Sequence, residues 1–245
     1  MNEEYGRRIE RFREILKEGN AVFFGGAGVS TESGIPDFRS TDGLYAQEYD
    51  YPPETMVSHT FFTLKTAEFF RFYKNKMLFP NAEPNACHLA LSQLEKEGNL
   101  SAVLTQNIDG LHQKAGSKKV FELHGSVWRN YCLKCKKPHT MYEVIAKNGV
   151  PTCDCGGVIK PDVVLYEEPL DNAVWAGALG AVRKANTLIV GGTSLVVYPA
   201  ANLIREFNGE HIVVINRTPT SADELAEVLF SEDIGKVFTD VMQGW

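Results

Sequence analysis

The chain has no long apolar run, no excess of basic charge and few cysteines. Among its 245 residues, no apolar stretch approaches the roughly 18 residues that a membrane span needs. Residues 1–20 are charged throughout, without the apolar centre of a signal peptide. The 31 Asp and Glu against 25 Lys and Arg give a net charge of −6, which argues against a broad nucleic-acid surface. We therefore expect a cytoplasmic protein with no membrane partner and no direct nucleic-acid partner.

Cysteine is scarce, with five in the whole chain. Because a cytoplasmic compartment keeps thiols reduced, they indicate metal binding or catalysis rather than disulfides. Four form two close pairs, Cys132-x2-Cys135 and Cys153-x-Cys155. Four thiolates complete the coordination of zinc and leave no position for water, so we predict a structural zinc ribbon. A redox dithiol and a catalytic zinc are the alternatives. The fifth, Cys87, has no partner at ligand spacing and is predicted to be a core residue.

Glycine is concentrated in one stretch, AVFFGGAGVSTESGIPDFR at residues 21–39. Residues 21–24 predict a buried strand. Gly26 and Gly28 predict a tight turn with positive φ, and the residues from 29 onward predict a helix whose N-terminus faces an anion. The oxidoreductase fingerprint is incomplete, however, because its third glycine position is Thr31 and no acid ends a second strand about 20 residues on. A dinucleotide site and a glycine turn without a ligand both stay open here.

Apolar segments with the period of strands alternate with segments of helical period. Tyr5, Ile9, Phe12 and Leu16 fall on one face of a helix that Gly19 ends. This alternation predicts an α/β fold with a parallel, doubly wound sheet covered on both faces. The strands are expected at 21–24, 101–105, 119–123, 163–166, 187–192 and 211–216, and further helices at 84–98, from 111, at 171–185, from 199 and at 231–243.

Polar residues follow several of these strands where each one ends. They are GGAGVST, then QNID at 106–109, HG at 124–125, GTS at 192–194 and Asn216. Each could be turn chemistry alone, but ligands of doubly wound sheets bind outside the carboxyl ends of the strands. A lone histidine is most often structural, yet His124 at a strand end before glycine can titrate near neutral pH. The residues thus indicate a nucleotide-binding enzyme with a histidine acid or base, and they leave the reaction open.

Together these motifs resemble the sirtuins, a family of NAD-dependent protein-lysine deacylases. The resemblance rests on GAGVSTESGIPDFR at 26–39, TQNIDGLH at 105–112, ELHGS at 122–126, the cysteine pairs, KPDVV at 160–164, GGTSLVVYPA at 191–200 and VVIN at 213–216. It spans nearly the whole chain in the order of the family. It implies a Rossmann-like NAD-binding domain, NAD as a co-substrate, one structural zinc and acetylated lysine in a protein or peptide as the other substrate.

The resemblance also implies roles for single residues. Asp109 would hold the nicotinamide carboxamide, and Asn107 would place the ribose and a water. His124 would be the general base on a ribose hydroxyl, so that the acetyl group passes to ADP-ribose while nicotinamide and lysine are released. The catalytic pair would be His124 and Asn107, and the residues implied to contact NAD are Gly26, Ala27, Gly28, Thr31, Phe38, Arg39, Gln106, Asn107, Ile108, Asp109, His124, Gly192, Thr193, Ser194, Asn216 and Ile234.

The peptide would bind as an added strand against Val164, Leu195 and Val196, with its acetyl-lysine beside His124. The implied division has a Rossmann-like domain from residues 1–39, 84–130 and 160–245. A smaller domain combines a helical cofactor-loop insert at 40–83 with the zinc ribbon at 131–159. Within the insert we expect a loop at 40–60 and an aromatic helical segment at 61–79 that packs as core.

One departure from the sirtuin pattern and one pair of residues bear on specificity. Where many members have Phe-Gly-Glu, this chain has Tyr166-Glu167-Glu168, whose added negative charge favours basic peptides. Members that remove succinyl or malonyl groups resemble one another in a Tyr-x-x-Arg pair, whereas the comparable stretch here runs from Tyr73 to Lys76. Lysine lacks the guanidinium fork, so uncharged acyl groups are expected.

Four alternatives remain beside a deacetylase. Removal of longer or acidic acyl groups and transfer of ADP-ribose to protein would use the same cofactor cleavage. A hydride-transfer dehydrogenase is disfavoured by the missing ribose acid. A zinc-ribbon module that senses NAD or binds nucleic acid without catalysis is disfavoured by the acidic balance and by the presence of His124 and Asn107.

Overall fold

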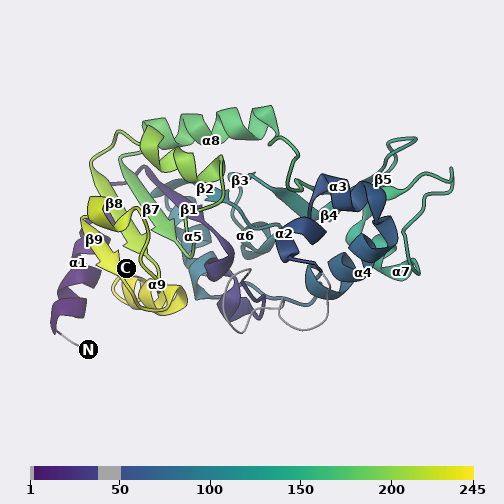
Figure 1. Cartoon of the computed structure of the whole chain (residues 1–245). Helices are drawn as coiled ribbons and strands as arrows, with labels where there is room; N and C mark the ends of the chain where they lie inside the picture. The colour runs from purple at the N-terminus through teal and green to yellow at the C-terminus, as the bar shows by residue number, and fades with distance from the viewer. Residues whose placement is uncertain (1–2, 38–50) are drawn as a thin grey trace.

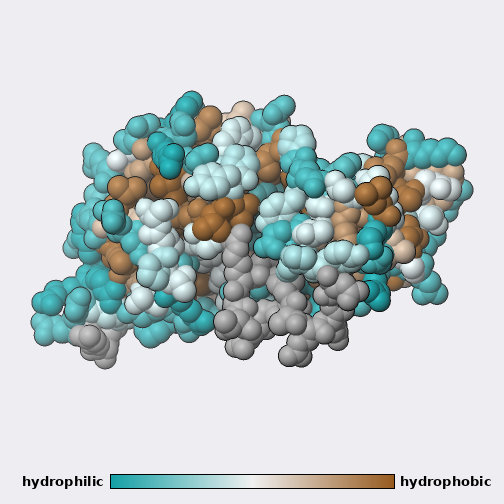
Figure 2. Space-filling model, viewed as in Figure 1, coloured by the Kyte–Doolittle hydropathy of each residue, from teal (hydrophilic) through white to brown (hydrophobic). Residues whose placement is uncertain are grey.

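The computed structural model of the chain describes residues 3–37 and 51–245. Two parts lie next to each other along its long axis (Figure 1). The larger part holds a six-stranded sheet with helices on both faces, and the smaller part holds a three-stranded sheet with short helices. Seen from the same side, the surface is mainly hydrophilic, with hydrophobic residues in small groups over both parts (Figure 2).

The large sheet has the strand order β3-β2-β1-β7-β8-β9, and every pairing in it is parallel. Numbered within the sheet alone, this is the order 3-2-1-4-5-6 of doubly wound dinucleotide-binding folds, so the predicted fold class is confirmed. The strand order reverses between β1 and β7, which is where such folds bind ligands. The strands are β1 (Ala21–Gly25), β2 (Leu100–Thr105), β3 (Val120–Glu122), β7 (Thr187–Gly191), β8 (His211–Ile215) and β9 (Val228–Phe230).

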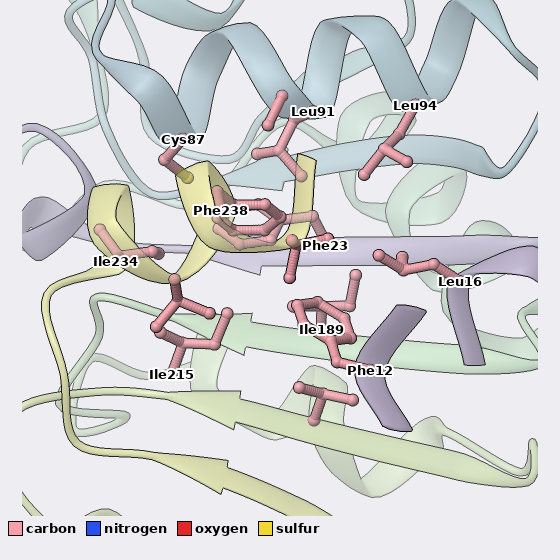
Figure 3. Packing of buried hydrophobic residues seen from close by; sticks show 14 of the residues in the cluster. Phe12, Leu16, Phe23, Cys87, Leu91, Leu94, Ile189, Ile215, Ile234 and Phe238 are labelled. Atoms are coloured by element: carbon pink, nitrogen blue, oxygen red, sulfur yellow. The ribbon is translucent and has the colours of Figure 1, made fainter. Parts of the chain in front are cut away.

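Alternate residues of these strands pack into two cores, one on each face of the sheet. On one face, Phe23 and Ile189 meet Phe12 of α1 (Glu3–Lys17) and Phe238 of α9 (Ile234–Met242), together with α5 (Ala86–Lys96) (Figure 3). On the other face, Phe24 and its neighbours pack against α8 (Asn172–Lys184) and the 3-10 helix η3 (Ala200–Glu206). Burial on both faces explains why the strands are apolar throughout.

The smaller part has its own hydrophobic core. Its sheet pairs β4 (Gly125–Cys132) antiparallel with β5 (Pro138–Thr140) and β6 (Ile159–Val163). The helices α2 (Pro53–Met56), α3 (His59–Leu64), α4 (Thr66–Lys76) and α7 (Met141–Ala146) belong to this part. Phe62, Phe69, Phe70 and Tyr73 are buried in its core, so the predicted core role of the aromatic segment 61–79 is confirmed.

Several sequence expectations about local structure were wrong. After β1 the chain forms two short 3-10 turns, η1 (Ala27–Val29) and η2 (Thr31–Ser33), in place of an α-helix. Gly26 has φ −129°, and neither it nor Gly28 has a positive φ. The helix expected from 199 is the 3-10 helix η3. Within the expected loop 40–60, α2 and the start of α3 are helical, and residues 40–50 of that loop lie outside the described residues.

Residues 163–166 are not a strand of the parallel sheet. Strand β6 ends at Val163 and pairs with β4, and Tyr166 forms only an isolated bridge with Ser58. An apolar run sets a preference for extended backbone but does not specify its neighbour, which explains the error. The helix α6 (Leu111–Ala115) begins where the sequence predicts, whereas the sequence pattern missed the 3-10 helix η4 (Asp223–Leu225) and β9. Among the described residues, no helix has the length and apolar content to cross a membrane.

Candidate active site

A cavity of about 610 Å³ opens at the carboxyl ends of the strands. Residues from both parts line it, with the loops after β1, β2, β7 and β8 on one side and residues 163–168 with α2 on the other. Most residues predicted to contact NAD are in its lining: Gly26, Ala27, Gly28, Thr31, Gln106, Asn107, Ile108, Asp109, His124, Gly192, Thr193, Ser194, Asn216 and Ile234. Phe38 and Arg39 lie outside the described residues.

The glycine loop after β1 rests directly on the loop after β7. Gly26 N donates to Gly191 O at 3.2 Å, and Gly28 N donates to Gly192 O at 2.8 Å. A Cβ on residue 28 would lie 2.8 Å from Gly192 Cα, and one on residue 26 would lie 2.9 Å from Thr193 Cβ. The two glycines are therefore required for close approach of backbones rather than for a left-handed turn.

Ser30 joins the glycine loop to the QNID segment. Its buried Oγ accepts from Asn107 Nδ2 at 3.0 Å and donates to Asp109 Oδ2 at 2.7 Å. Asp109 also accepts from Leu111 N at 2.9 Å through Oδ1. Sequence reasoning did not single out Ser30, although its place in the GAGVST motif was the available signal. The serine fixes the orientation of both side chains at the wall of the cavity.

Burial raises the pKa of the Asp109 carboxyl, and its hydrogen bonds from Leu111 N and Ser30 partly oppose this. Strand β4 also holds the backbone of the QNID segment, because Trp128 Nε1 donates to Asp109 O at 2.6 Å and Val127 N donates to Ile108 O at 3.0 Å. The loop after β2 is thus rigidly placed by β4.

His124 lies at the boundary between the two parts of the molecule. Its Nδ1 is 3.0 Å from Gln106 O, and because a carbonyl can only accept, Nδ1 holds the proton. Nε2 is then the basic nitrogen of the neutral ring. Burial lowers the pKa of the imidazole, and the hydrogen bond to the Gln106 carbonyl partly offsets this shift. A half-buried neutral imidazole on the cavity wall can accept a proton.

The side chain of Gln106 connects the loops after β2 and β7, because its Nε2 donates to Thr193 Oγ1 at 2.9 Å. Asn216 follows β8, and its Nδ2 donates to Thr218 O at 2.6 Å. Its neighbour Arg217 also lines the cavity, and Nε of that arginine donates to Asp233 Oδ1 at 2.6 Å. Apart from Asp233, these polar residues all line the same cavity.

The residues predicted for the peptide are only partly in the cavity wall. Val164 lines it. Leu195 is buried with φ 55°, Val196 is exposed, and neither is in the lining. Val197 and Tyr198 line the cavity from the same loop.

Tyr73 and Lys76 occupy different environments. Tyr73 is fully buried, its ring stacks on Phe69 with centroids 5.6 Å apart, and its hydroxyl has no partner among the described residues. Burial raises the pKa of that phenol. Lys76 lines the cavity. The two side chains therefore do not form a joint site for an acyl group in this structure.

The four paired cysteines converge as a metal site requires. Their Sγ atoms all lie within 4.8 Å of one another, with 3.4 Å between Cys132 and Cys155 and 3.7 Å between Cys135 and Cys153. Thiolates at ~2.3 Å from a tetrahedral zinc lie about 3.8 Å apart, so the geometry fits the metal. None of the four is among the described residues that line the cavity. A zinc here would support the small sheet and take no part in chemistry.

The fold and the site define a dinucleotide-binding α/β protein whose cavity is closed on one side by a smaller part with a four-cysteine metal site. The chain belongs to the Sir2 family, whose sequence model matches residues 26–199.

Curated relatives and solved structures agree with this assignment. An NAD-dependent protein deacetylase of Clostridium perfringens is 56% identical over 243 residues, which cover 96% of this chain and 98% of that protein. An NAD-dependent protein deacetylase of Clostridium acetobutylicum is 53% identical over 240 residues, with 96% and 98% covered. A Sir2 structure with a deacetylated p53 peptide and 3′-O-acetyl ADP ribose is 40% identical, with a TM-score of 0.88 and 96% and 98% of the two chains covered. A Sir2 structure with p53 peptide and NAD+ is 39% identical, with a TM-score of 0.84 and the same coverage.

Proposed function

We propose that this protein is an NAD-dependent protein-lysine deacetylase that transfers the acetyl group of an acetyl-lysine to ADP-ribose and releases nicotinamide. The observation that supports this most directly is that one cavity is lined by His124, whose Nδ1 is held by Gln106 O, and by the Ser30-bridged pair Asn107 and Asp109, in a chain of the Sir2 family. NAD supplies the ADP-ribosyl group that receives the acetyl group.

The residues of the cavity divide this work among them. Asp109, whose carboxyl is oriented by Ser30 and Leu111 N, would hydrogen-bond the nicotinamide carboxamide, and Asn107 would orient the ribose. His124 Nε2 takes the proton of a ribose hydroxyl, while its Nδ1–H remains held by Gln106 O. The glycine loop supplies close backbone approach to the phosphates, and Thr193, Ser194 and Asn216 surround the adenosine.

The acyl-lysine would enter from the side of Val164, where the two parts of the molecule meet. The loop at 194–198 would provide the second edge for the peptide, through its backbone more than through the side chains of Leu195 and Val196. We propose a preference for uncharged acyl groups, because Lys76 offers no guanidinium fork.

The test is to incubate the purified protein with NAD and a panel of acyl-lysine peptides and to follow nicotinamide and peptide mass. We expect nicotinamide release that depends on acetyl-peptide, with loss of the acetyl mass from the peptide. A gain of ADP-ribose mass on protein would instead indicate transfer, and absorbance of reduced cofactor would indicate hydride chemistry. Strong turnover of succinyl-peptide with little of acetyl-peptide would contradict the acyl preference. His124→Tyr, which should abolish turnover while the fold survives, is the control.

A further inference from the structure

Residues 163–168 connect the catalytic histidine to the first helices of the smaller part. At one end, Val164 N donates to His124 O at 3.0 Å. At the other end, Tyr166 N donates to Val57 O at 3.0 Å, and His59 N donates to Tyr166 O at 2.9 Å. All six residues of this segment line the cavity. Any change in its path would therefore alter the wall along which a substrate chain is expected to lie.

Glu167 has an unusual backbone for its side chain. Its φ is 75°, in the left-handed region that glycine adopts freely and residues with a Cβ adopt rarely. Its carboxylate is fixed on Thr60 of α3, with Oε2 accepting from Thr60 N at 2.9 Å and from Thr60 Oγ1 at 2.7 Å. These two hydrogen bonds lower the pKa of Glu167, so the ionised form is the one that is held.

The two hydrogen bonds between the Glu167 carboxylate and Thr60, called the clasp below, help to satisfy the N–H groups at the start of α3. Of its first N–H groups, His59 N donates to Tyr166 O, Thr60 N donates to Glu167 Oε2, and Phe61 N donates to Ser58 Oγ at 3.1 Å. Two of the three acceptors thus come from the segment 163–168. The segment and the helix hold each other in place.

The same conformation leaves backbone groups of the segment available. Within the described part of the chain, neither Glu167 N–H nor Val164 O has a backbone partner. An extended chain that adds a strand to an edge uses such groups.

We propose that Glu167 is a positioning residue for the substrate peptide: its carboxylate, clasped to Thr60, holds its own backbone in the left-handed form that presents the peptide-pairing edge. This inference rests on the proposed function and assigns a role to a position where many sirtuins have glycine. Glu167 acts through geometry, and its charge is not what the substrate reads.

The experiment compares the wild-type protein with Glu167→Ala, Glu167→Gly and Glu167→Gln, and measures KM for acetyl-lysine peptide, KM for NAD and kcat. Glu167→Ala loses the clasp but keeps the steric cost of the left-handed form, so peptide KM should rise on the order of five-fold or more. KM for NAD and kcat should change less than about two-fold. In Glu167→Gly, peptide KM should rise less than in Glu167→Ala, because glycine adopts the left-handed conformation freely. Glu167→Gln keeps an acceptor oxygen for Thr60 and should restore most of the affinity.

Thr60→Val tests the partner, since it removes the hydroxyl and leaves the N–H. It should raise peptide KM less than Glu167→Ala does, and the double variant should be no worse than Glu167→Ala alone. Circular dichroism and zinc content monitor folding. The proposal would be overturned if peptide KM rose as much in Glu167→Gln as in Glu167→Ala and rose further with the positive charge of the peptide. That result would show that the charge of Glu167 is what matters. An unchanged peptide KM in Glu167→Ala, or equal losses in kcat and in NAD KM, would also overturn it.

Direct titration of a labelled acetyl-lysine peptide into each protein separates this inference from the proposed function. If the wild type turns over and binds peptide but the variants match it, only the positioning role fails. If the wild type neither turns over nor binds any acyl-lysine peptide, both proposals fail.

Discussion

His124 shows how a single residue acquires its chemistry from its surroundings. The Gln106 carbonyl fixes the proton on Nδ1, and burial favours the neutral ring. Ser30 orients two other side chains, because its hydroxyl lies between Asn107 and Asp109 and hydrogen-bonds to both. The residue types were readable in the sequence, but these states were not.

The lowered pKa of His124 leads to a pH prediction. If the neutral imidazole is the base, a lower pKa keeps that form present to lower pH, so the acidic limb of kcat/KM should have its midpoint below the ordinary histidine value of about 6.5. His124→Ala should remove this limb and lower the rate about 10²- to 10⁴-fold. Steady-state rates with acetyl-peptide and NAD over a range of pH check this. A midpoint clearly above the ordinary histidine value would contradict the assignment.

At the scale of elements, two buried histidines lie between α5 and α6. The rings of His88 and His112 have centroids 4.7 Å apart, and both side chains are buried. His88 Nε2 and both ring nitrogens of His112 have no partner among the described residues. The helix α5 also holds the glycine loop, because Asn85 Nδ2 donates to Val29 O at 2.8 Å and to Ser33 Oγ at 3.0 Å. The helix that carries His88 therefore contacts the glycine loop that lines the cavity.

Desolvation lowers the pKa of His88 to about 4 and lowers that of His112 well below its usual value. The unfolded chain then binds more protons than the folded one below about pH 6.5, so stability should fall as pH drops through that range. His88 alone should lower the free energy of unfolding by roughly 2 kcal/mol between about pH 7 and pH 5. Denaturant unfolding at each pH measures this.

His88→Gln is the matched variant for this prediction. Glutamine at the third helical position keeps an acceptor for the Asn85 N–H but does not titrate. Its stability should depend less on pH than that of the wild type. Burial opposes protonation of His211, but its hydrogen bonds to Glu227 and Glu18 outweigh this and raise its pKa. His211 therefore adds stability at low pH that is lost as the pH rises. Both proteins contain it, so it does not affect the comparison. Parallel pH curves for the two proteins would exclude the proposed contribution of His88.

The whole molecule has separate cores in its two parts, and the cysteine site lies in the smaller one. Cys132, Cys153 and Cys155 pack with the aromatic cluster of α3 and α4, whereas the parallel sheet has its own two cores. The division of the chain into an NAD-binding domain and a smaller domain of insert and ribbon stays a prediction. It can be tested together with the metal.

Removal of zinc by a chelator, or Cys132→Ala, should destabilise the smaller part first, because an unpaired set of thiols replaces a closed metal site. We expect loss of about one zinc per chain and a new low-temperature unfolding transition, with the main transition retained. Metal analysis and calorimetry provide the measurement. Unchanged zinc content and thermal stability in Cys132→Ala would contradict a structural zinc.

By itself, the sequence determined the α/β class, most strands of the parallel sheet, the two pairs of cysteines that converge and the polar groups at the strand ends. These follow from local properties, since buried parallel strands are apolar and the cysteines of a zinc ribbon come in pairs close in sequence. The prediction of a parallel strand at 163–166 was wrong because an apolar run does not specify its partner; β6 pairs with β4 instead.

The tertiary structure alone decided what depends on residues far apart in the chain. Gly28 is needed because Gly192 approaches it, Ser30 bonds a residue 79 positions away, and Glu167 is held by Thr60 at a distance of 107 positions. Local propensity cannot encode such contacts, because they exist only once the sheet and the two cores have brought these segments together.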